Sequence, residues 1–156
     1  MMHVIPEAVL VGATVGNGLL AGVFFAFSRG VAPGLRRVDD RAYVTAFRAI
    51  NRSIVNVLFL LVFLGAPIAT AAAAALHLDG ARREALAGLV PALVLSLLSF
   101  AVTVLVNVPL NNRLAAAPTG DVQLRKARDD FEIRWNRWNH VRTATSTAAL
   151  ALLAII

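Results

Sequence analysis

The sequence contains no cysteine, which excludes disulfide bonds, thiolate metal sites and cysteine nucleophiles. Charged residues are also scarce, at 15% of the chain against about a quarter in soluble domains. The chain has neither a phosphate-binding glycine loop nor a dinucleotide-binding motif, and no nucleophilic triad stands out. Its histidines and acidic residues lack the spacing of a zinc or iron site with three or four ligands. We therefore expect neither a bound metal ion nor a nucleotide cofactor, and we predict no cofactor.

Long apolar segments dominate what is present. Hydrophobic residues make up 58% of the chain, and its mean hydropathy is +0.71. Apolar segments cover residues 8–28, 54–76, 85–106 and 139–156, and about 20 apolar residues span a bilayer core of about 30 Å. The last segment is marginal, because its helical length is about 27 Å. We predict an all-α membrane protein, with residues 1–156 forming a single transmembrane domain: an antiparallel four-transmembrane-helix bundle.

The distribution of positive charge predicts the orientation of this bundle. The net charge is +6, which in a soluble protein would suggest a nucleic-acid partner. Here the basic residues gather between the first and second apolar segments and between the third and fourth. The positive-inside rule places these two loops in the cytoplasm and both termini outside. We therefore predict an integral protein of a bacterial inner membrane, with membrane lipids as partners and no nucleic acid.

Turn and cap signals divide the chain further. The stretch "SRGVAPGLRR", with its glycines and proline, predicts that the first helix ends near Ser28. A second helix is predicted to start at Asp39 or Asp40 and to run without a break into the second apolar segment. The turn "APTGD" opens a long helix from about Asp121 into the fourth segment. The cytoplasmic loops are thus predicted to be largely helical extensions of the bundle.

Glycines at intervals of four residues mark the first apolar segment. The pairs are Gly12 with Gly16 and Gly18 with Gly22. This small-xxx-small spacing lets transmembrane helices approach closely. We interpret it as close packing within the bundle.

Polar residues within the apolar segments point to an internal site. Such residues are costly in a bilayer and normally face the bundle interior or a water-filled cavity. On helical wheels, the polar and aromatic stripes consist of Asn17, Phe24 and Ser28; Arg48, Arg52, Asn56, Phe59 and Phe63; Ser96, Thr103, Asn107 and Asn111; and Phe131, Trp135, Trp138 and Arg142 with Asn139 beside them. Most of them converge at the cytoplasmic end, which predicts a vestibule with asparagines and arginines at its rim and aromatic walls.

Structural interpretations of the same residues stay open. Trp135 and Trp138 are also typical of the aromatic belt at a membrane interface. The asparagines could equally form hydrogen bonds between helices, and Glu132 could serve only as a salt-bridge partner of an arginine. His140 projects roughly opposite to Arg142 on the wheel and is also consistent with a solvated residue at the interface.

The segments "FSRGVAPGLRR", "YVTAFRAINRSIVN", "NVPLNNRLA" and "FEIRWNRWNHVRTATSTAA" resemble, in this order and spacing, the DUF1772 family of small membrane proteins, grouped with the anthrone oxygenases. The resemblance covers nearly the whole chain. It implies a four-helix membrane protein that oxidises an anthrone to an anthraquinone with dioxygen, without a dedicated redox cofactor. The positions that match the family's signature are Asn51, Arg52, Asn56, Asn107, Pro109, Asn111, Trp135, Trp138, Asn139, His140, Arg142 and Thr143.

The implied reaction assigns roles to these residues. An anthrone loses a methylene proton to give a delocalised anion, so the site needs a base and donors for the developing oxyanion. We predict His140, Arg142 and Arg52 as catalytic residues, although the wheel turns His140 away from Arg142. The predicted substrate-binding residues are Asn51, Asn56, Asn107, Asn111, Trp135, Trp138, Asn139 and Phe59.

Other functions are compatible with the sequence. The chain could be a non-catalytic small membrane subunit or a lipid- or quinone-binding protein of a larger complex. A homo-oligomer and a membrane-complex subunit both stay open, as does a planar aromatic or quinone-like small molecule as the ligand. Transport is less favoured, because four helices are few for a carrier and no inverted repeat is visible.

Overall fold

The computed structural model describes residues 4–78 and 83–156, and every regular element in these ranges is helical. The predicted all-α class is confirmed. In chain order the elements are α1 (Val4–Ala26), the π-helical turn η1 (Phe27–Val31), α2 (Ala32–Leu35), α3 (Asp40–Ile54), α4 (Val57–Leu76), the 3₁₀ turn η2 (Arg83–Ala85), α5 (Leu86–Val102), the π-helical turn η3 (Thr103–Asn107), α6 (Val108–Ala116) and α7 (Asp121–Ala154).

Three stretches of helix are long and apolar enough to cross a membrane. They are Ile5–Leu35, Val57–Leu76 and Arg83–Ala116. These stretches coincide with the first three predicted apolar segments. Within the described residues α7 is not among them, so the predicted fourth span, residues 139–156, is not found as a stretch of that kind. The helix carries polar side chains such as Asn139, Arg142 and Thr145 in this region.

The first and third of these helices run further than predicted. The first does not end near Ser28 but continues through η1 and α2 to Leu35, and the third continues through η3 and α6. A proline follows each π turn closely, Pro33 in α2 and Pro109 in α6. A proline removes one helical hydrogen bond, and a wide turn just before it lets the helix continue with a bend.

The predicted unbroken helix from Asp39 into the second span is wrong. The N-cap is confirmed, since the Asp39 carboxylate accepts a hydrogen bond from Ala42 N at 2.8 Å. However, α3 ends at Ile54 and α4 starts afresh at Val57. Asn56 causes the restart: its Oδ1 caps α4 by accepting from Phe59 N at 3.0 Å, and its NH₂ group donates to Ser53 O. The long final helix from Asp121, by contrast, is confirmed.

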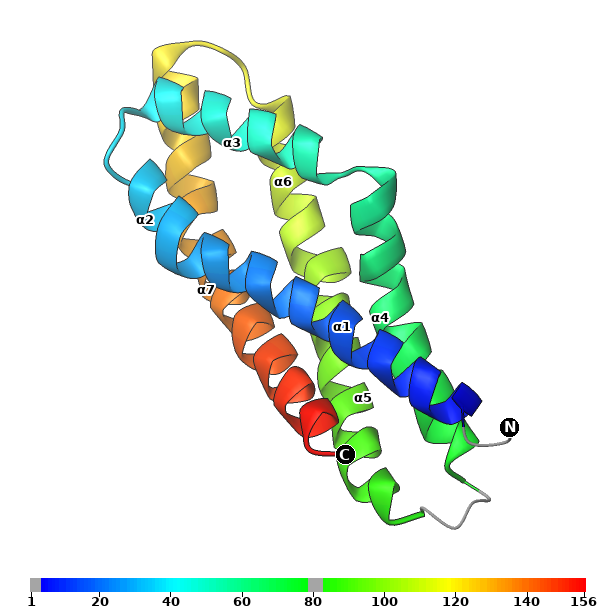
Figure 1. Cartoon of the computed structure of the whole chain (residues 1–156). Helices are drawn as coiled ribbons and strands as arrows, with labels where there is room; N and C mark the ends of the chain where they lie inside the picture. Colours follow the sequence, from blue (N-terminus) through cyan, green and yellow to red (C-terminus); the bar gives the residue numbers. More distant parts are fainter. Residues whose placement is uncertain (1–3, 79–82) are drawn as a thin grey trace.

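The long helices pack in a ring. Helix α1 contacts α4 and α7, and α5 contacts the same two neighbours. Neighbouring helices run in opposite directions in Figure 1. Helices α1 and α4 approach each other closely at Gly16, where an added Cβ would lie 3.2 Å from the Cβ of Ala66. A Cβ at Gly18 would lie 3.4 Å from the Leu150 side chain of α7, whereas Gly12 and Gly22 have no neighbour within 4 Å. One member of each predicted glycine pair therefore lies at a helix contact.

A second core extends beyond the apolar spans. Helices α2, α3 and α6 and the first half of α7 gather at one end of the molecule, away from both termini (Figure 1). Their buried side chains form one hydrophobic cluster: Tyr43, Val44, Phe47, Leu110, Leu114, Leu124, Phe131 and Trp135. Trp135 lies at the boundary between this cluster and the spans. The predicted helical extensions thus form a packed layer over one end of the ring.

Candidate functional site

A cavity of about 260 Å³ lies where this layer meets the ring of long helices. Residues from α1, η1, α3, α4, η3, α6 and α7 line it, so the site exists only in the folded chain. Its aromatic walls are Phe24, Phe27, Phe47, Phe59, Phe63 and Trp135. The volume is slightly below the usual range of about 300–1,000 Å³ for ligand pockets. It is therefore large enough only for a small molecule.

The side chain of Arg142 is the charged group of this cavity. The residue is 5% exposed, and its guanidinium carbon lies 4.3 Å from the ring centroid of Phe24 and 5.3 Å from that of Trp135. Its Nη2 donates to Asn139 Oδ1 at 2.7 Å, and its Nη1 donates to Thr103 Oγ1 at 3.3 Å.

No carboxylate offsets this charge. Within the described part of the chain no acidic side chain pairs with Arg142, and its Nε has no hydrogen-bond partner. A buried cation without an anion is unfavourable by several kcal/mol. The position of Arg142 therefore favours a ligand that carries or develops negative charge.

Asn139 holds Arg142 in place from behind. Its NH₂ group donates to Phe24 O at 3.1 Å and to Ser28 Oγ at 2.8 Å, which leaves Oδ1 to accept from the guanidinium. Ser28 in turn shares a hydrogen bond of 2.9 Å with the hydroxyl of Thr143. Asn139 does not line the cavity, so its place is that of a positioning residue.

Both π turns border the site. Phe27 is the first residue of η1 and lines the cavity, and Thr103 is the first residue of η3 and binds Arg142. Insertions of this kind in helices often occur at functional sites. They re-aim side chains by one position, which a wheel drawn at 100° per residue cannot show.

A chain of hydrogen bonds links cavity residues of α7, α6 and α3. The indole Nε1 of Trp135 donates to Asn111 Oδ1 at 2.8 Å, and Asn111 Nδ2 donates to Asn51 Oδ1 at 2.8 Å. Because an indole nitrogen is only a donor, it decides the orientation of both amides. The NH₂ group of Asn51 is left at the end of the chain, with no partner in the described structure. Like the Nε of Arg142, it is a donor at the cavity wall with no partner in the described structure.

The structure brings about half of the predicted site residues together. Asn51, Phe59, Asn111, Trp135 and Arg142 line the cavity. Asn107 is fully buried behind the wall, where its Nδ2 lies 3.4 Å from Trp135 O and its Oδ1 has no partner. Asn139 lies behind Arg142, as described above.

The other four predicted residues lie outside the cavity. Arg52 and Asn56 are exposed, and their predicted inward direction is wrong, because it assumed a continuous helix through Val55. Trp138 is half-buried. His140 is exposed on the opposite face of α7, in a shallow groove with Ser28, so the conflict with Arg142 on the wheel is real.

Two aromatic residues of the cavity wall, Phe27 and Phe47, were absent from the predicted polar and aromatic stripes. Phe27 is the first residue after α1, at the start of the π turn. Phe47 did leave a signal in the sequence, because Tyr43, Phe47 and Asn51 follow one another at intervals of four residues on the buried face of α3. The sequence pattern had instead been interpreted with the neighbouring face, which carries Arg48, pointing inward. Arg48 caps the end of α6, where it donates to Leu114 O at 2.8 Å.

A comparison with known families bears on this site. Residues 57–152 match the sequence profile of the anthrone oxygenase family. The chain belongs to this family. No curated protein and no solved structure matches the chain.

The matched region of this anthrone oxygenase family member includes most of the cavity. It covers α4 through nearly all of α7, and therefore Phe59, Phe63, Asn111, Trp135 and Arg142. Helix α3, which supplies Phe47 and Asn51, precedes the match. The resemblance noted in the sequence is thus confirmed at the level of the family.

Ion pairs at the same end of the molecule have a structural role. Arg128 pairs with Glu132 at 2.8 Å and with Asp40 at 3.1 Å, and Glu132 also accepts from Arg36 at 3.0 Å. The interpretation of Glu132 as a salt-bridge partner is confirmed. The guanidinium of Arg128 lies 4.4 Å from the centroid of the Tyr43 ring. Burial, with the Glu132 carboxylate nearby, raises the pKa of Tyr43 well above its usual value, so its hydroxyl stays neutral.

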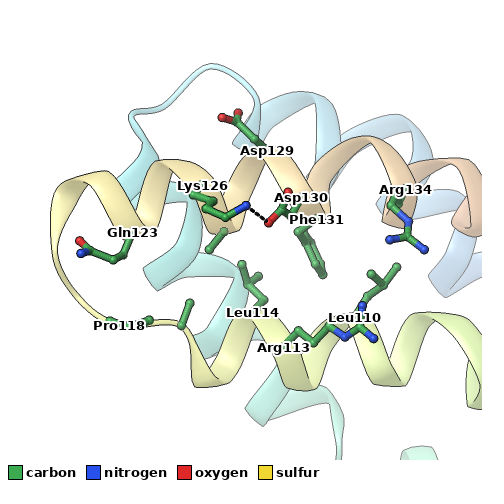
Figure 2. Close-up of a pocket in the computed structure, with 12 residues that line it drawn as sticks. Leu110, Arg113, Leu114, Pro118, Gln123, Lys126, Asp129, Asp130, Phe131 and Arg134 are labelled. Atoms are coloured by element: carbon green, nitrogen blue, oxygen red, sulfur yellow. Dashed lines mark hydrogen bonds and ion pairs between the residues drawn. The ribbon is translucent and has the colours of Figure 1, made fainter.

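A second depression lies between α6 and α7 and is shown in Figure 2. Apolar side chains such as Leu114 and Phe131 point into it, and Lys126 pairs with Asp130 at 2.9 Å along its edge. Both partners of this ion pair are well exposed. It holds no buried, unpaired polar group, which distinguishes it from the cavity at Arg142. Among the described residues, no group of three histidines or carboxylates is placed to hold a metal ion.

Proposed function

We propose that this chain oxidises a planar aromatic substrate of the anthrone or quinol type with dioxygen, in the cavity at Arg142 and without a dedicated redox cofactor. One observation carries the proposal: a buried arginine that has no carboxylate partner faces a cavity walled by aromatic rings. Membership of the anthrone oxygenase family supports the same reaction class.

The cavity residues divide the task between binding and charge stabilisation. Phe59, Phe63 and Trp135 can stack on a flat ring system. Loss of a methylene proton from an anthrone moves negative charge onto the carbonyl oxygen. Donors already aimed at that oxygen in a dry site stabilise it strongly, because they need no reorganisation. Arg142 is placed for this role, and the free NH₂ group of Asn51 can orient a second polar group of the substrate.

The oxidation balances without a protein-bound redox group. A quinol would pass two electrons and its two hydroxyl hydrogens to dioxygen, which leaves as hydrogen peroxide; an anthrone takes up an oxygen atom as follows. The substrate CH₂ loses a proton to give the anion, which transfers its electrons to dioxygen. One oxygen atom ends in the new carbonyl of the quinone, and the other leaves as water with the two methylene hydrogens. Among the described residues that line the cavity there is no Asp, Glu, His, Lys or Tyr. The proton therefore leaves without a protein base, along the polar edge of the cavity beside the exposed side chain of Asn112. Arg142 contributes by making the substrate more acidic.

We also propose that the ring of helices is a four-span membrane bundle, with the C-terminal half of α7 as the fourth span. Exposed large hydrophobic residues on α1, α4 and α5 support this, because they would contact acyl chains. Exposed arginines gather at the end that holds α2, α3 and α6. By the positive-inside rule this end is cytoplasmic, and both termini lie outside.

Oxygen uptake tests the proposed reaction. The purified protein in detergent is mixed with an anthrone in isotopically labelled dioxygen, and consumption, quinone and label are measured. We expect enzyme-dependent uptake, with one labelled oxygen atom in the quinone. If the protein binds the product quinone without any acceleration of oxidation over buffer, the catalytic proposal fails and the non-catalytic binding function takes its place.

A further inference from the structure

The cavity is not buried evenly. Its floor, formed by Phe24, Trp135 and Arg142, is almost fully inaccessible. Its rim, in contrast, includes Val55 at 55% exposure, with Leu60 and Val108 at 41% each. These exposed lining residues lie on one side of the cavity. We therefore place its opening there, between the corner that joins α3 to α4 and the start of α6.

The surface around this mouth is apolar. The exposed side chains next to it on α4 include Val57, Leu58 and Leu61. Leu105, in η3 just before α6, is also exposed. These residues belong to stretches long and apolar enough to cross a membrane. An exposed apolar patch of this kind in such stretches matches acyl chains rather than water.

Polar residues lie on one edge of the mouth. Asn112 is exposed and lines the cavity, and Arg52 is exposed near the end of α3. Both lie toward the charged end of the molecule. An arginine at this depth can extend its head group into the lipid phosphate layer while its stem remains among apolar groups. The mouth is thus placed just beneath the head groups.

We infer that the substrate reaches Arg142 sideways from the bilayer, through the mouth formed by Val55, Leu60 and Val108. This inference rests on the proposed function and narrows its substrate class. The substrate is a lipophilic, uncharged, planar aromatic that partitions into the membrane and becomes anionic only inside the cavity. A charged or sugar-bearing aromatic would not pass an apolar rim open to acyl chains.

The helix break makes this mouth possible. Asn56 bonds both to Ser53 O and to Phe59 N, so it holds the corner that carries Val55. Had α3 run straight into α4, as the sequence suggested, Val55 would lie within a continuous helix. Asn56, which was predicted to bind substrate, therefore shapes the access path instead.

Single cysteines test the access path, because the native chain has none to interfere. The variant Val108→Cys, assembled in lipid nanodiscs, is modified with a bulky apolar thiol reagent. The matched control is Leu105→Cys, three residues away and 73% exposed but not part of the cavity wall. Binding of a hydroxyanthraquinone, a non-reacting planar probe, is followed by quenching of tryptophan fluorescence, since Trp135 lines the cavity.

We expect modification at Val108→Cys to slow association and dissociation of the probe by about tenfold each, with Kd unchanged, because a blocked path raises the barrier and not the end states. The modified Leu105→Cys control should keep both rates. Unchanged rates in the modified Val108→Cys variant, or a weaker Kd with an unchanged association rate, would overturn the inference.

A second measurement, the rate of thiol modification, tests whether the mouth faces lipid. In nanodiscs a charged, membrane-impermeant thiol reagent should modify Val108→Cys much more slowly than Arg137→Cys, which is exposed at the charged end of α7. Equal rates would show a mouth open to water and overturn the inference. If the unmodified protein shows no quenching at all, the proposed function itself fails. If the probe quenches the fluorescence but modification of Val108→Cys does not change its binding rates, only the inferred access path is refuted.

Discussion

The replacement Arg142→Met is the sharpest perturbation of the proposed site. Methionine fills most of the space of the arginine stem but carries neither charge nor donor. It removes the hydrogen bonds to Asn139 Oδ1 at 2.7 Å and to Thr103 Oγ1 at 3.3 Å. It also removes the only charged side chain among the described lining residues of the cavity. The variant therefore tests oxyanion stabilisation directly.

The size of the effect follows from the geometry. Removal of one donor to a developing oxyanion lowers kcat by about 10²–10³-fold, or about 2.7–4 kcal/mol. Because no other cation lines the cavity, we expect a loss at the upper end of that range. KM should change less, since the neutral ground state is bound mainly by the aromatic walls. The kcat of Arg142→Lys should lie between those of wild type and Arg142→Met, because an ammonium cannot reach both Asn139 and Thr103 as a planar guanidinium does.

The fold should survive this change. The variant leaves Asn139 Oδ1 without its donor, at a cost of about 1–3 kcal/mol. This loss is offset because a buried, partly unpaired cation disappears, which is itself unfavourable by several kcal/mol. Size-exclusion chromatography and thermal unfolding in detergent check this expectation.

The assay is oxygen uptake against anthrone concentration, for wild type, Arg142→Met and the matched control Arg137→Met. Arg137 lies on the same helix but is exposed and has no partner in the described structure. The control should keep wild-type kcat. A folded Arg142→Met protein with kcat within about threefold of wild type, less than 1 kcal/mol in barrier height, would refute the reasoning.

Three further outcomes are expected. Asn139→Ala should lower kcat by about 10–100-fold with little change in KM. The variant loses a hydrogen bond worth about 1.5–3 kcal/mol, which orients Arg142 from outside the cavity. An equal rise in KM would contradict this positioning role. His140→Gln should leave kcat nearly unchanged, because the residue is exposed on the opposite face of α7, whereas a loss like that of Arg142→Met would show that it is the base after all. Gly16→Val should lower the melting temperature, since overpacking against α4 costs about 1–3 kcal/mol. Gly12→Val should leave the melting temperature unchanged, because a Cβ added there meets nothing within 4 Å. Equal shifts in both variants would contradict the close approach at Gly16.

The sequence patterns succeeded where the signal was local. Apolar runs located the three stretches that are long and apolar enough to cross a membrane. The turn before Asp121 located the start of α7, and Asp39 was identified as a cap. The opposition of His140 and Arg142 was also visible on a wheel, because α7 is an unbroken helix through both residues. Regular geometry over a short distance was enough for each of these predictions.

The failures share a different physical cause. An asparagine such as Asn56 can face a bundle interior or cap a new helix, and the sequence does not say which hydrogen bonds it makes. Whether a helix widens into a π turn, as at Phe27 and Thr103, depends on what packs around it. An error at either point breaks the register between the residues before and after it. The direction of Arg52 was inferred from that of Asn56 across such a break, and Arg52 was misplaced in this way.

By itself, the sequence determined the helical class, the apolar spans, the concentration of positive charge at one end and the family. Each of these follows from composition, periodicity or order along the chain. Only the tertiary structure decided that Arg142 packs against Phe24 and Trp135 without a carboxylate partner among the described residues, and that Asn51 from α3 lines the same cavity. Such a site depends on contacts between residues about a hundred positions apart, as between Phe24 and Asn139. Local periodicity carries no record of which distant helices pack together.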